Sequence, residues 1–228
     1  MKTSYILLAI IALITLMGMV ATDVLLKQEY DKIDWRNPYQ DFEKRSLPRV
    51  NHWVVEGTPA NEIMLMHSAD KPQALVAPGL VKFFRFRQQG DTAFVSFTPD
   101  YSGYQSEPRD EADRELSIRL VLWLPDWQTL RVENARLTLS EFKGNKLTIA
   151  LRNSRLRTNK LIISDSFDLT ASANSFAVLG ADQYKSLRTI VQDSSGVQLN
   201  NTQTEAFTKA LSPKAEIQVR GQALKWLK

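Results

Sequence analysis

The sequence predicts an all-β chain that coils into a parallel β-helix, or solenoid, with rungs of about 20 residues, preceded by one N-terminal transmembrane helix. Three observations carry this prediction. The chain opens with a long uncharged run, short alternating segments separated by turn signals follow, and one pattern of strand, small corner and strand then recurs from Leu116 to Lys228. A repeat of this size cannot bury its apolar edge alone, so each copy must stack on its neighbours.

The N-terminal helix is predicted from residues 3–22, a stretch without a charge between Lys2 and Asp23. As a helix, this length spans a hydrocarbon core of about 30 Å. A cleavable signal peptide normally has a shorter apolar core and a small-x-small exit, whereas the best exit here, Met19-Val20-Ala21, begins with a large residue. We therefore expect an uncleaved membrane anchor, with a signal peptide that is removed on export as the alternative.

The flanking charges do not set the orientation, because Lys2 precedes the helix while Lys27, Lys32 and Arg36 follow it among acids. A repeat domain behind a leading apolar segment is most simply read as exported. We expect a single-pass protein of the cytoplasmic (inner) membrane whose C-terminal domain faces the periplasm or the exterior. The chain has no Cys, which rules out disulfides and fits either compartment.

Residues 23–49 are predicted to form a stalk of mixed charges and aromatic residues, and residues 50–228 the solenoid domain. Turn signals divide the first part of this domain into four expected strands: Val50–Val55, Glu62–Met66, Leu80–Arg87 and Thr92–Phe97. Two excursions are expected from the coil, the polar loop Pro99–Arg114 and the segment Asn200–Pro213. Only brief helices are expected within the domain, at Arg109–Glu115 and Glu205–Leu211.

The repeat is read from one apolar position that follows a small or polar corner in each copy. These positions recur at intervals of roughly 20 residues, the last interval being longer, and are Leu137, Leu156, Phe176, Val197 and Leu224. A period-2 strand precedes each corner: Leu130/Val132, Leu147/Ile149/Leu151, Phe167/Leu169/Ala171, Leu187/Thr189/Val191 and Ala215/Ile217/Val219. Trp226 falls at an inward position of the last copy, so we expect it to cap the open end of the coil.

From Leu116 to Leu139 an alternating strand ends in Pro125, a Leu-x-Val strand follows, and the corner Asn134-Ala135-Arg136 leads into the next strand. This run resembles the signature of the autotransporter-adhesin head GIN domain family. The later corners, at Asn153-Ser154, Asn174-Ser175 and 193–196, and the opening segment 50–97 extend the resemblance over about residues 50–228. The resemblance implies a right-handed parallel β-helix in a bacterial cell envelope, with no catalytic residues to carry over.

Little in the sequence indicates chemistry. The only histidines, His52 and His67, fall on different expected strands, so no catalytic residue, metal site or cofactor is predicted. A net charge of +4 does not favour nucleic acid as the partner of an exported domain. Acidic residues at 110–113, and Asp165 with Asp168, leave a β-helix enzyme acting on polysaccharide as a less favoured alternative.

The more suggestive feature is basic. Between Arg131 and Lys160 basic side chains far outnumber the acids, of which there are only Glu133 and Glu141. The repeat register places Arg136 and Arg155 at one corner position of adjacent rungs, where like charges repel unless an anion compensates. The candidate ligand-binding residues are Arg136, Arg152, Arg155 and Arg157, with an anionic polysaccharide or lipid headgroup as ligand. The alternative interpretation is a solubilising face with partners elsewhere in the fold.

The sequence thus predicts a non-enzymatic, membrane-anchored envelope protein, an adhesin-like binding module for an anionic ligand. Two alternatives stay open. One is a structural or accessory subunit of an envelope or export complex with a protein partner, and the other is the polysaccharide-acting enzyme.

Overall fold

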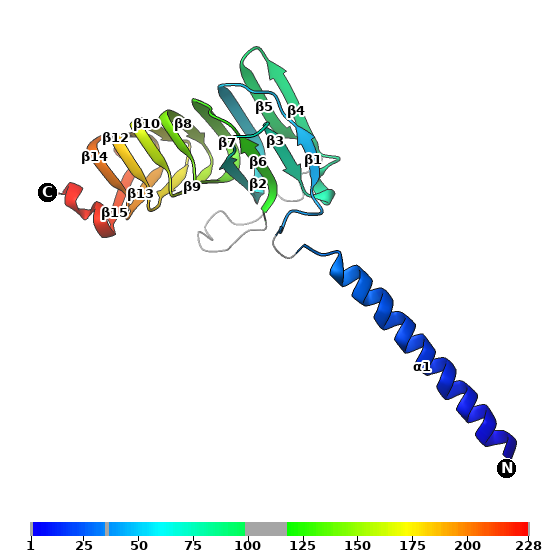
Figure 1. Ribbon diagram of the computed structural model, residues 1–228. Coiled ribbons are helices and arrows are strands. Elements are labelled where there is room, and N and C mark those ends of the chain that lie inside the picture. The colour runs from blue at the N-terminus through cyan, green and yellow to red at the C-terminus, as the bar shows by residue number, and fades with distance from the viewer. Residues whose placement is uncertain (1, 35–36, 99–117, 228) are drawn as a thin grey trace. The chain divides into compact units, whose positions relative to one another are not determined.

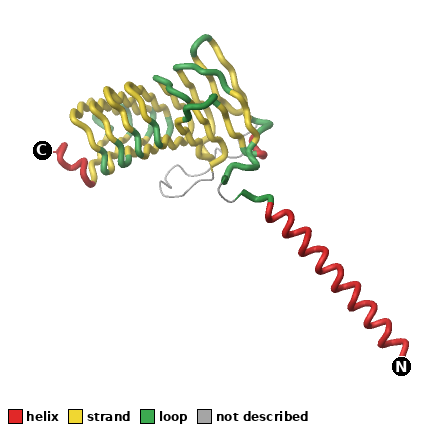
Figure 2. The backbone as a smooth tube through the Cα atoms, in the orientation of Figure 1, coloured by secondary structure: helices red, strands yellow, loops and turns green. Residues whose placement is uncertain are grey.

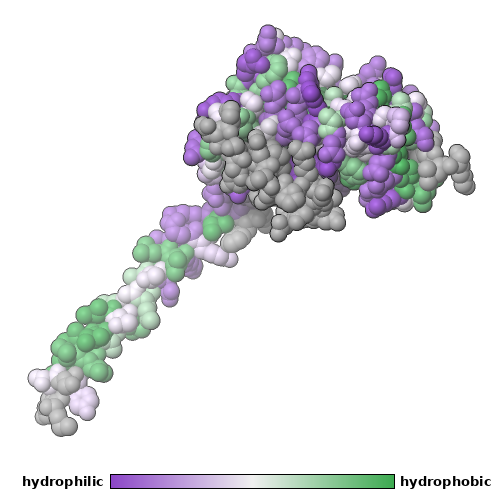
Figure 3. Space-filling view, turned by 180° about the vertical axis from the view of Figure 1, so that it is seen from behind, coloured by the Kyte–Doolittle hydropathy of each residue, from purple (hydrophilic) through white to green (hydrophobic). Residues whose placement is uncertain are grey.

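The computed structural model describes residues 2–34, 37–98 and 118–227, in two compact units divided between Asp41 and Phe42. The first unit contains the helix α1 (Lys2–Asp31). All of its described side chains are exposed to solvent along the whole length of the helix. Its stretch from Tyr5 is long and apolar enough to cross a membrane, which also fits a signal sequence near the N-terminus. Figure 3 shows this helix largely covered by apolar side chains, in contrast to the mostly polar surface of the second unit in that view.

The second unit is a β-solenoid, as predicted, in which 15 strands form one hydrogen-bonded sheet that coils into two faces (Figures 1 and 2). Two long strands, β2 (His52–His67) and β7 (Thr129–Ser140), bend across a corner and belong to both faces. In later rungs the same path is divided between two strands, as in β8 (Lys143–Arg152) and β9 (Arg155–Asn159).

The first face therefore runs from β4 through β5, β2, β7 and β8 to β10, β12 and β14. The second face runs from β1 through β3, β6, β2, β7 and β9 to β11, β13 and β15. The bounds of the remaining strands are β1 Glu43–Ser46, β3 Gln73–Val76, β4 Phe84–Gln89, β5 Thr92–Phe97, β6 Ile118–Leu124, β10 Ile162–Ser172, β11 Phe176–Leu179, β12 Gln183–Val191, β13 Gly196–Asn200, β14 Gln203–Leu211 and β15 Glu216–Arg220.

Stacked apolar columns form the core. On the first face, the parallel register aligns Val55, Val132, Leu151, Ala171 and Val191, all of them buried. On the second face the inner column is Ile63, Leu137, Leu156, Ala177, Val197 and Ile217, and from Leu137 onward its members recur once per rung of the predicted length. Strand alternation puts every second side chain into this interior, so the period-2 pattern becomes the core.

The register corrects two positions of the predicted repeat. Phe176 pairs with Arg155 and Gly196 on the outside of the second face, while the small Ala177 occupies the inner column. The last rung also ends earlier than predicted, because Ile217, not Leu224, pairs with Val197. Leu224 instead lies in the 3-10 helix η3 (Gly221–Leu227) and is half exposed.

The expected excursion Asn200–Pro213 and the short helix Glu205–Leu211 are both wrong. This segment contains β14, which pairs in parallel with β12 and continues the first face. The polar composition of β14 misled the prediction, because a terminal strand has little core to face and most of its side chains are exposed. The other excursion, Pro99–Arg114, and the helix Arg109–Glu115 lie outside the described residues.

The early strands differ from the prediction mainly in their bounds. The two predicted strands at 50–55 and 62–66 are parts of β2, and the one predicted at Leu80–Arg87 begins at Phe84, after the 3-10 turn η1 (Pro78–Leu80). Two strands were not predicted, β1 within the stretch read as stalk and β3, which pairs in antiparallel fashion with both β1 and β6. Antiparallel pairs thus close the N-terminal end of the coil, and β4 with β5 does the same on the first face.

Two kinds of corner join the faces. At the corner between the first and second faces, Asn134, Asn153, Asn174 and Asp193 have positive φ angles between 49° and 63°, a conformation that Asn and Asp tolerate better than most residues. Serine hydroxyls join neighbouring rungs there: Ser154, Ser175 and Ser195 accept the backbone N–H of Ala135, Ser154 and Ser175 in turn. The opposite corner stacks Phe142, Leu161, Asp182, Thr202 and Ala223, all buried.

The 3-10 helix η3 lies at the C-terminal end of the coil. The buried Ala223 of η3 covers the last corner residue of the stack, whereas Trp226, expected to cap the core, lies in the same helix with its side chain outside the described part. At the end of the first face, Lys209 takes the inward column occupied by Leu169 and Thr189 in earlier rungs, and it is exposed. A charge at this position of an edge strand discourages edge-to-edge association.

Candidate functional site

The four arginines singled out in the sequence lie around one corner of the coil. Arg136 and Arg155 are partners on adjacent strands of the second face, β7 and β9, so the predicted stacking is present. Arg157 lies further along β9, on the same outer surface. Arg152 lies on the first face at the end of β8, separated from Arg155 by the turn at Asn153 and Ser154. We refer to these four residues as the arginine corner.

The strand geometry explains why the arginines gather. Adjacent strands are about 4.8 Å apart, and residues at i and i+2 point to the same side. Arg155 and Arg157 therefore share a surface within one strand, and Arg136 joins them from the next rung. The turn is tight because Asn153 adopts a φ of 49° and its amide donates a hydrogen bond of 2.6 Å to Asn134 Oδ1.

The basic stretch is partly compensated by acids, as the alternative interpretation expected. Arg131 donates to Glu133 at 2.6 Å, and Lys146 and Lys160 lie 3.4 Å from Asp165 and Glu141. These six residues are partly or fully exposed, so their ion pairs contribute little to stability. Within the arginine corner, Arg152 and Arg157 are exposed and have no acidic partner among the described residues.

Arg155 is held in place by its surroundings. Its Nη1 donates to the backbone oxygen of Asn174 at 3.3 Å, and its guanidinium carbon lies 5.8 Å from the centre of the Phe176 ring. Phe176 is the strand partner of Arg155 on the next rung. Its ring therefore lies on the outer surface, where it contacts the Arg155 guanidinium. A fixed guanidinium loses less conformational freedom when it binds a carboxylate or phosphate.

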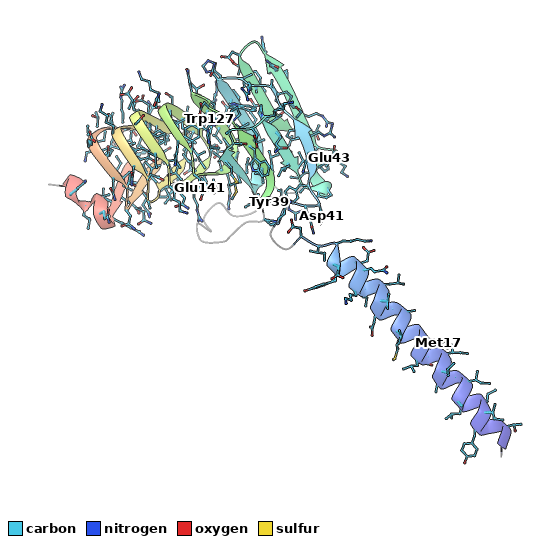
Figure 4. All side chains as sticks on the ribbon, viewed as in Figure 1. Met17, Tyr39, Asp41, Glu43, Trp127 and Glu141 are labelled. Atoms are coloured by element: carbon cyan, nitrogen blue, oxygen red, sulfur yellow. The ribbon has the colours of Figure 1, made fainter. Side chains whose placement is uncertain are left out.

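A groove that the sequence did not predict follows the opposite corner. A hollow of about 940 Å³ lies at the start of β8 and β10, and a smaller one of about 390 Å³ continues along β10, β12 and β14, sharing Ile162 and Ser164 with the first. The lining is mixed, with Lys143, Lys146 and Lys185 among acids and amides. The buried rings of Trp127 and Phe142 contact each other beneath it, with centroids 5.0 Å apart (Trp127 is labelled in Figure 4).

The groove depends on an irregularity that no sequence period indicates. The pairing of β10 with both β8 and β12 shifts between Ile163 and Ser166. Just before the bulge, Ile162 is exposed over 41% of its surface, and within it Ser164 Oγ lies 2.8 Å from Asn145 Oδ1. β-Bulges commonly re-aim side chains in this way.

The histidines make structural contacts. His52 Nδ1 lies 2.7 Å from Thr129 Oγ1, and His67 Nε2 lies 3.2 Å from Asp126 Oδ1. The backbone N–H of Asn51, followed by its side-chain amide, lowers the pKa of the Asp91 carboxyl because both donate to the charged form. Within residues 2–34, 37–98 and 118–227, no three His, Asp or Glu side chains are grouped so that they could hold a metal ion.

The acids named as enzyme candidates do not meet in the described part. Asp165 borders the groove and pairs with Lys146, whereas Asp168 lies on the outer surface of the first face, opposite Thr148 and Arg188 in neighbouring strands. The acidic residues 110–113 lie outside the described residues.

One acid is fully buried. Asp182 Oδ1 accepts the backbone N–H of Leu161 at 2.9 Å, and Oδ2 accepts the Tyr184 hydroxyl at 2.9 Å and the Thr158 hydroxyl. Burial raises the pKa of Tyr184 well above its ordinary value, and the Asp182 charge adds to this effect. Asp182 itself is inaccessible to a ligand, and its hydrogen bonds hold the corner together.

Comparisons with known proteins agree with this architecture and go no further. No family model matches the chain, and no curated protein matches it. A crystal structure of a "putative adhesin" from Parabacteroides distasonis is similar with a TM-score of 0.57 at 10% identity, over 77% of this chain and 71% of that one. This similarity shows a shared fold.

Two further crystal structures are similar at lower scores. A "putative adhesin" from Bacteroides fragilis has a TM-score of 0.39 at 10% identity, over 78% of this chain and 95% of that one. A "putative lipid binding protein" from P. distasonis has a TM-score of 0.36 at 10% identity, over 80% and 96%.

Proposed function

We propose that this protein is a membrane-anchored, non-enzymatic binding module of a bacterial cell envelope, and that its arginine corner holds an anionic polymer. The main support for this proposal is the strand register, which stacks Arg136 on Arg155. Arg157 lies on the same strand as Arg155, and Arg152 lies across one turn from it. Four guanidinium groups on two rungs raise the local positive potential, which attracts a polyanion.

The chemistry of the corner favours carboxylate or phosphate groups. A guanidinium presents donors in a planar fork that matches either anion in a bidentate manner. The corner spans adjacent rungs about 4.8 Å apart, so consecutive charges of an extended polymer can each find a partner. The description of the P. distasonis protein as a "putative adhesin" is compatible with such a role on a similar fold.

The arrangement of the acids favours binding over catalysis. A glycosidase needs two carboxyl groups that face one substrate, whereas in the groove Asp165 pairs with Lys146 and Asp126 lies against His67. The helix α1 supplies the proposed anchor, and the solenoid would then be displayed on the far side of the inner membrane.

The test is binding of polyphosphate and polygalacturonate to the full chain in nanodiscs of neutral phosphatidylcholine, at about 50 and about 300 mM salt. We expect binding that weakens with salt, because the screening length falls from about 14 to about 6 Å. The double variant Arg152→Gln/Arg157→Gln should bind about 100-fold more weakly or worse, since it removes two guanidinium groups and each charge-assisted hydrogen bond contributes about 1.5–3 kcal/mol.

A matched control is Lys185→Gln/Arg188→Gln, which removes the same charge from exposed positions of β12. This control should retain most of the affinity. If both variants lose the same affinity, binding depends on the net charge of the protein and not on the arginine corner. If the affinity changes with neither salt nor substitution, the arginine corner is not a binding site.

A further inference from the structure

The N-terminal end of the solenoid carries a second group of cations, which we name the cationic edge: Lys82, Arg85 and Arg87. They lie in β4 and in the turn before it, and all three are exposed. None of them pairs with an acid in the part of the chain that the structure describes. In β4 the arginines alternate with Phe84 and Phe86, which pack against the core, so both charges point outward.

The cationic edge is ordered by its neighbours. The Arg87 guanidinium carbon lies 4.3 Å from the centre of the Phe94 ring, and Lys82 Nζ lies 4.7 Å from the centre of the Phe83 ring. Arg85 Nη1 donates to the backbone oxygens of Lys82 and Phe84, at 2.9 Å each. Cations over aromatic rings combine charge with an apolar base, a composition suited to the interface between water and lipid headgroups.

The nearby acid does not neutralise this edge. Asp91 lies in the turn between β4 and β5, where its two carboxylate oxygens accept hydrogen bonds from the backbone and the side-chain amide of Asn51. The His52 ring lies 3.9 Å from the same carboxylate. Counting the described residues of β4, β5 and their turns, three cations face one acid, which gives the edge a net positive charge.

The chain is tethered at the same end of the solenoid. β1 and β4 are the first strands of the two faces, and β1 follows α1 after residues 32–42. A connection of this length reaches at most about 40 Å when fully extended. If the apolar part of α1 spans the membrane, as proposed above, the helix continues from residue 22 to Asp31 and adds about 14 Å, so this end cannot lie further than about 55 Å from the bilayer surface.

We propose that the cationic edge docks onto anionic lipid headgroups of the membrane that holds α1, and that it thereby orients the solenoid with its N-terminal end on the bilayer. Three basic residues at an anionic leaflet favour the docked arrangement by roughly 100-fold. The arginine corner begins three strands further along the coil, about 14 Å from β4, and stays available to a polymer.

The absence of Cys from the chain allows a single-label test. A fluorophore is attached at Gln89→Cys in β4 or, as the distant position, at Gln192→Cys after β12, both exposed. The full-length protein is placed in nanodiscs that contain a headgroup quencher, with either phosphatidylglycerol mixed into phosphatidylcholine or phosphatidylcholine alone. We expect strong quenching at position 89 in the anionic nanodiscs only, reduced at high salt, and little at position 192.

The variant Lys82→Gln/Arg85→Gln/Arg87→Gln should lose this quenching. The control Lys185→Gln/Arg188→Gln/Lys214→Gln removes the same charge from exposed positions outside both the cationic edge and the arginine corner, and it should retain the quenching. Equal quenching in the two lipids, or equal loss in the two variants, would overturn the docking. Failure of the chain to enter nanodiscs would contradict the anchor itself and the docking with it, whereas intact anchoring without lipid dependence would contradict the docking alone.

Discussion

At the scale of single residues, the least expected group is the buried carboxyl of Asp182. A charge removed from water is costly unless hydrogen bonds replace its hydration, and here the Leu161 N–H and the Thr158 and Tyr184 hydroxyls do so. In the sequence, Asp182 looks like a turn residue after Gly180. Its burial follows from stacking between Leu161 and Thr202, which becomes visible only once the register is fixed.

Tyr184 makes this group sensitive to alkali. Because its pKa is raised in the folded state, its contribution to stability is complete below the unfolded pKa near 10 and falls as pH rises from there toward the folded pKa. We expect the free energy of unfolding of the wild type to fall with pH in this window more steeply than that of Tyr184→Phe, by about 1.4 kcal/mol per pH unit. Urea unfolding at several pH values between about 8 and 11 measures the difference, and parallel curves would contradict it.

At the scale of elements, the corners decide how well the rungs stack. In the first corner each serine hydroxyl accepts an N–H from the preceding rung, so backbone groups that leave the sheet still find partners. The small residues at Asn153-Ser154 and Asn174-Ser175 predicted tight turns, and the structure confirms this. The direction of the hydrogen bonds was not predictable, because it depends on the offset between neighbouring turns.

Ser175→Ala tests this ladder. The Ser175 hydroxyl accepts from Ser154 N at 3.1 Å and donates to Ser172 O at 2.6 Å, and both backbone groups would lose this partner. We expect a loss of about 2 kcal/mol of unfolding free energy. Ser186→Ala, on the outer surface of β12, serves as the control and should change stability by less than about 0.5 kcal/mol. A similar small effect at Ser175 would show that water replaces the hydroxyl.

The strands themselves show what a repeat pattern can and cannot predict. The pairing of Arg136 with Arg155 followed directly from counting residues between corners, and so did most of the core. Where the core thins out, the same counting failed: β14 has Lys209 where earlier rungs have Leu169 or Thr189, and its polar sequence resembles a loop. The groove was missed for another reason, since the bulge after Ile163 breaks the period on which the prediction rested.

At the scale of the whole molecule, the solenoid is a linear array in which each rung contacts only its neighbours. Stability in such an array varies along the axis, because terminal rungs lack one interface. The inward side chains reflect this gradient: Leu151 is 1% exposed in a central rung, whereas Leu211, in the same column, is 45% exposed in the last one. The N-terminal end is better covered, since Leu80, Val95 and Leu120 there are all buried.

Amide hydrogen exchange of the full-length protein should therefore be asymmetric. We expect the amides of β8 and β10 to be the slowest and those of β14 and β15 to exchange at least about tenfold faster, because the last rung opens without disturbing the rest. Phe207→Ala should speed exchange in β14 and β15 alone, whereas Leu169→Ala, in a fully buried central position, should raise it in the rungs on both sides. Exchange at one uniform rate along the coil would mean that the solenoid unfolds as a single cooperative unit, and the two variants would then accelerate every strand alike.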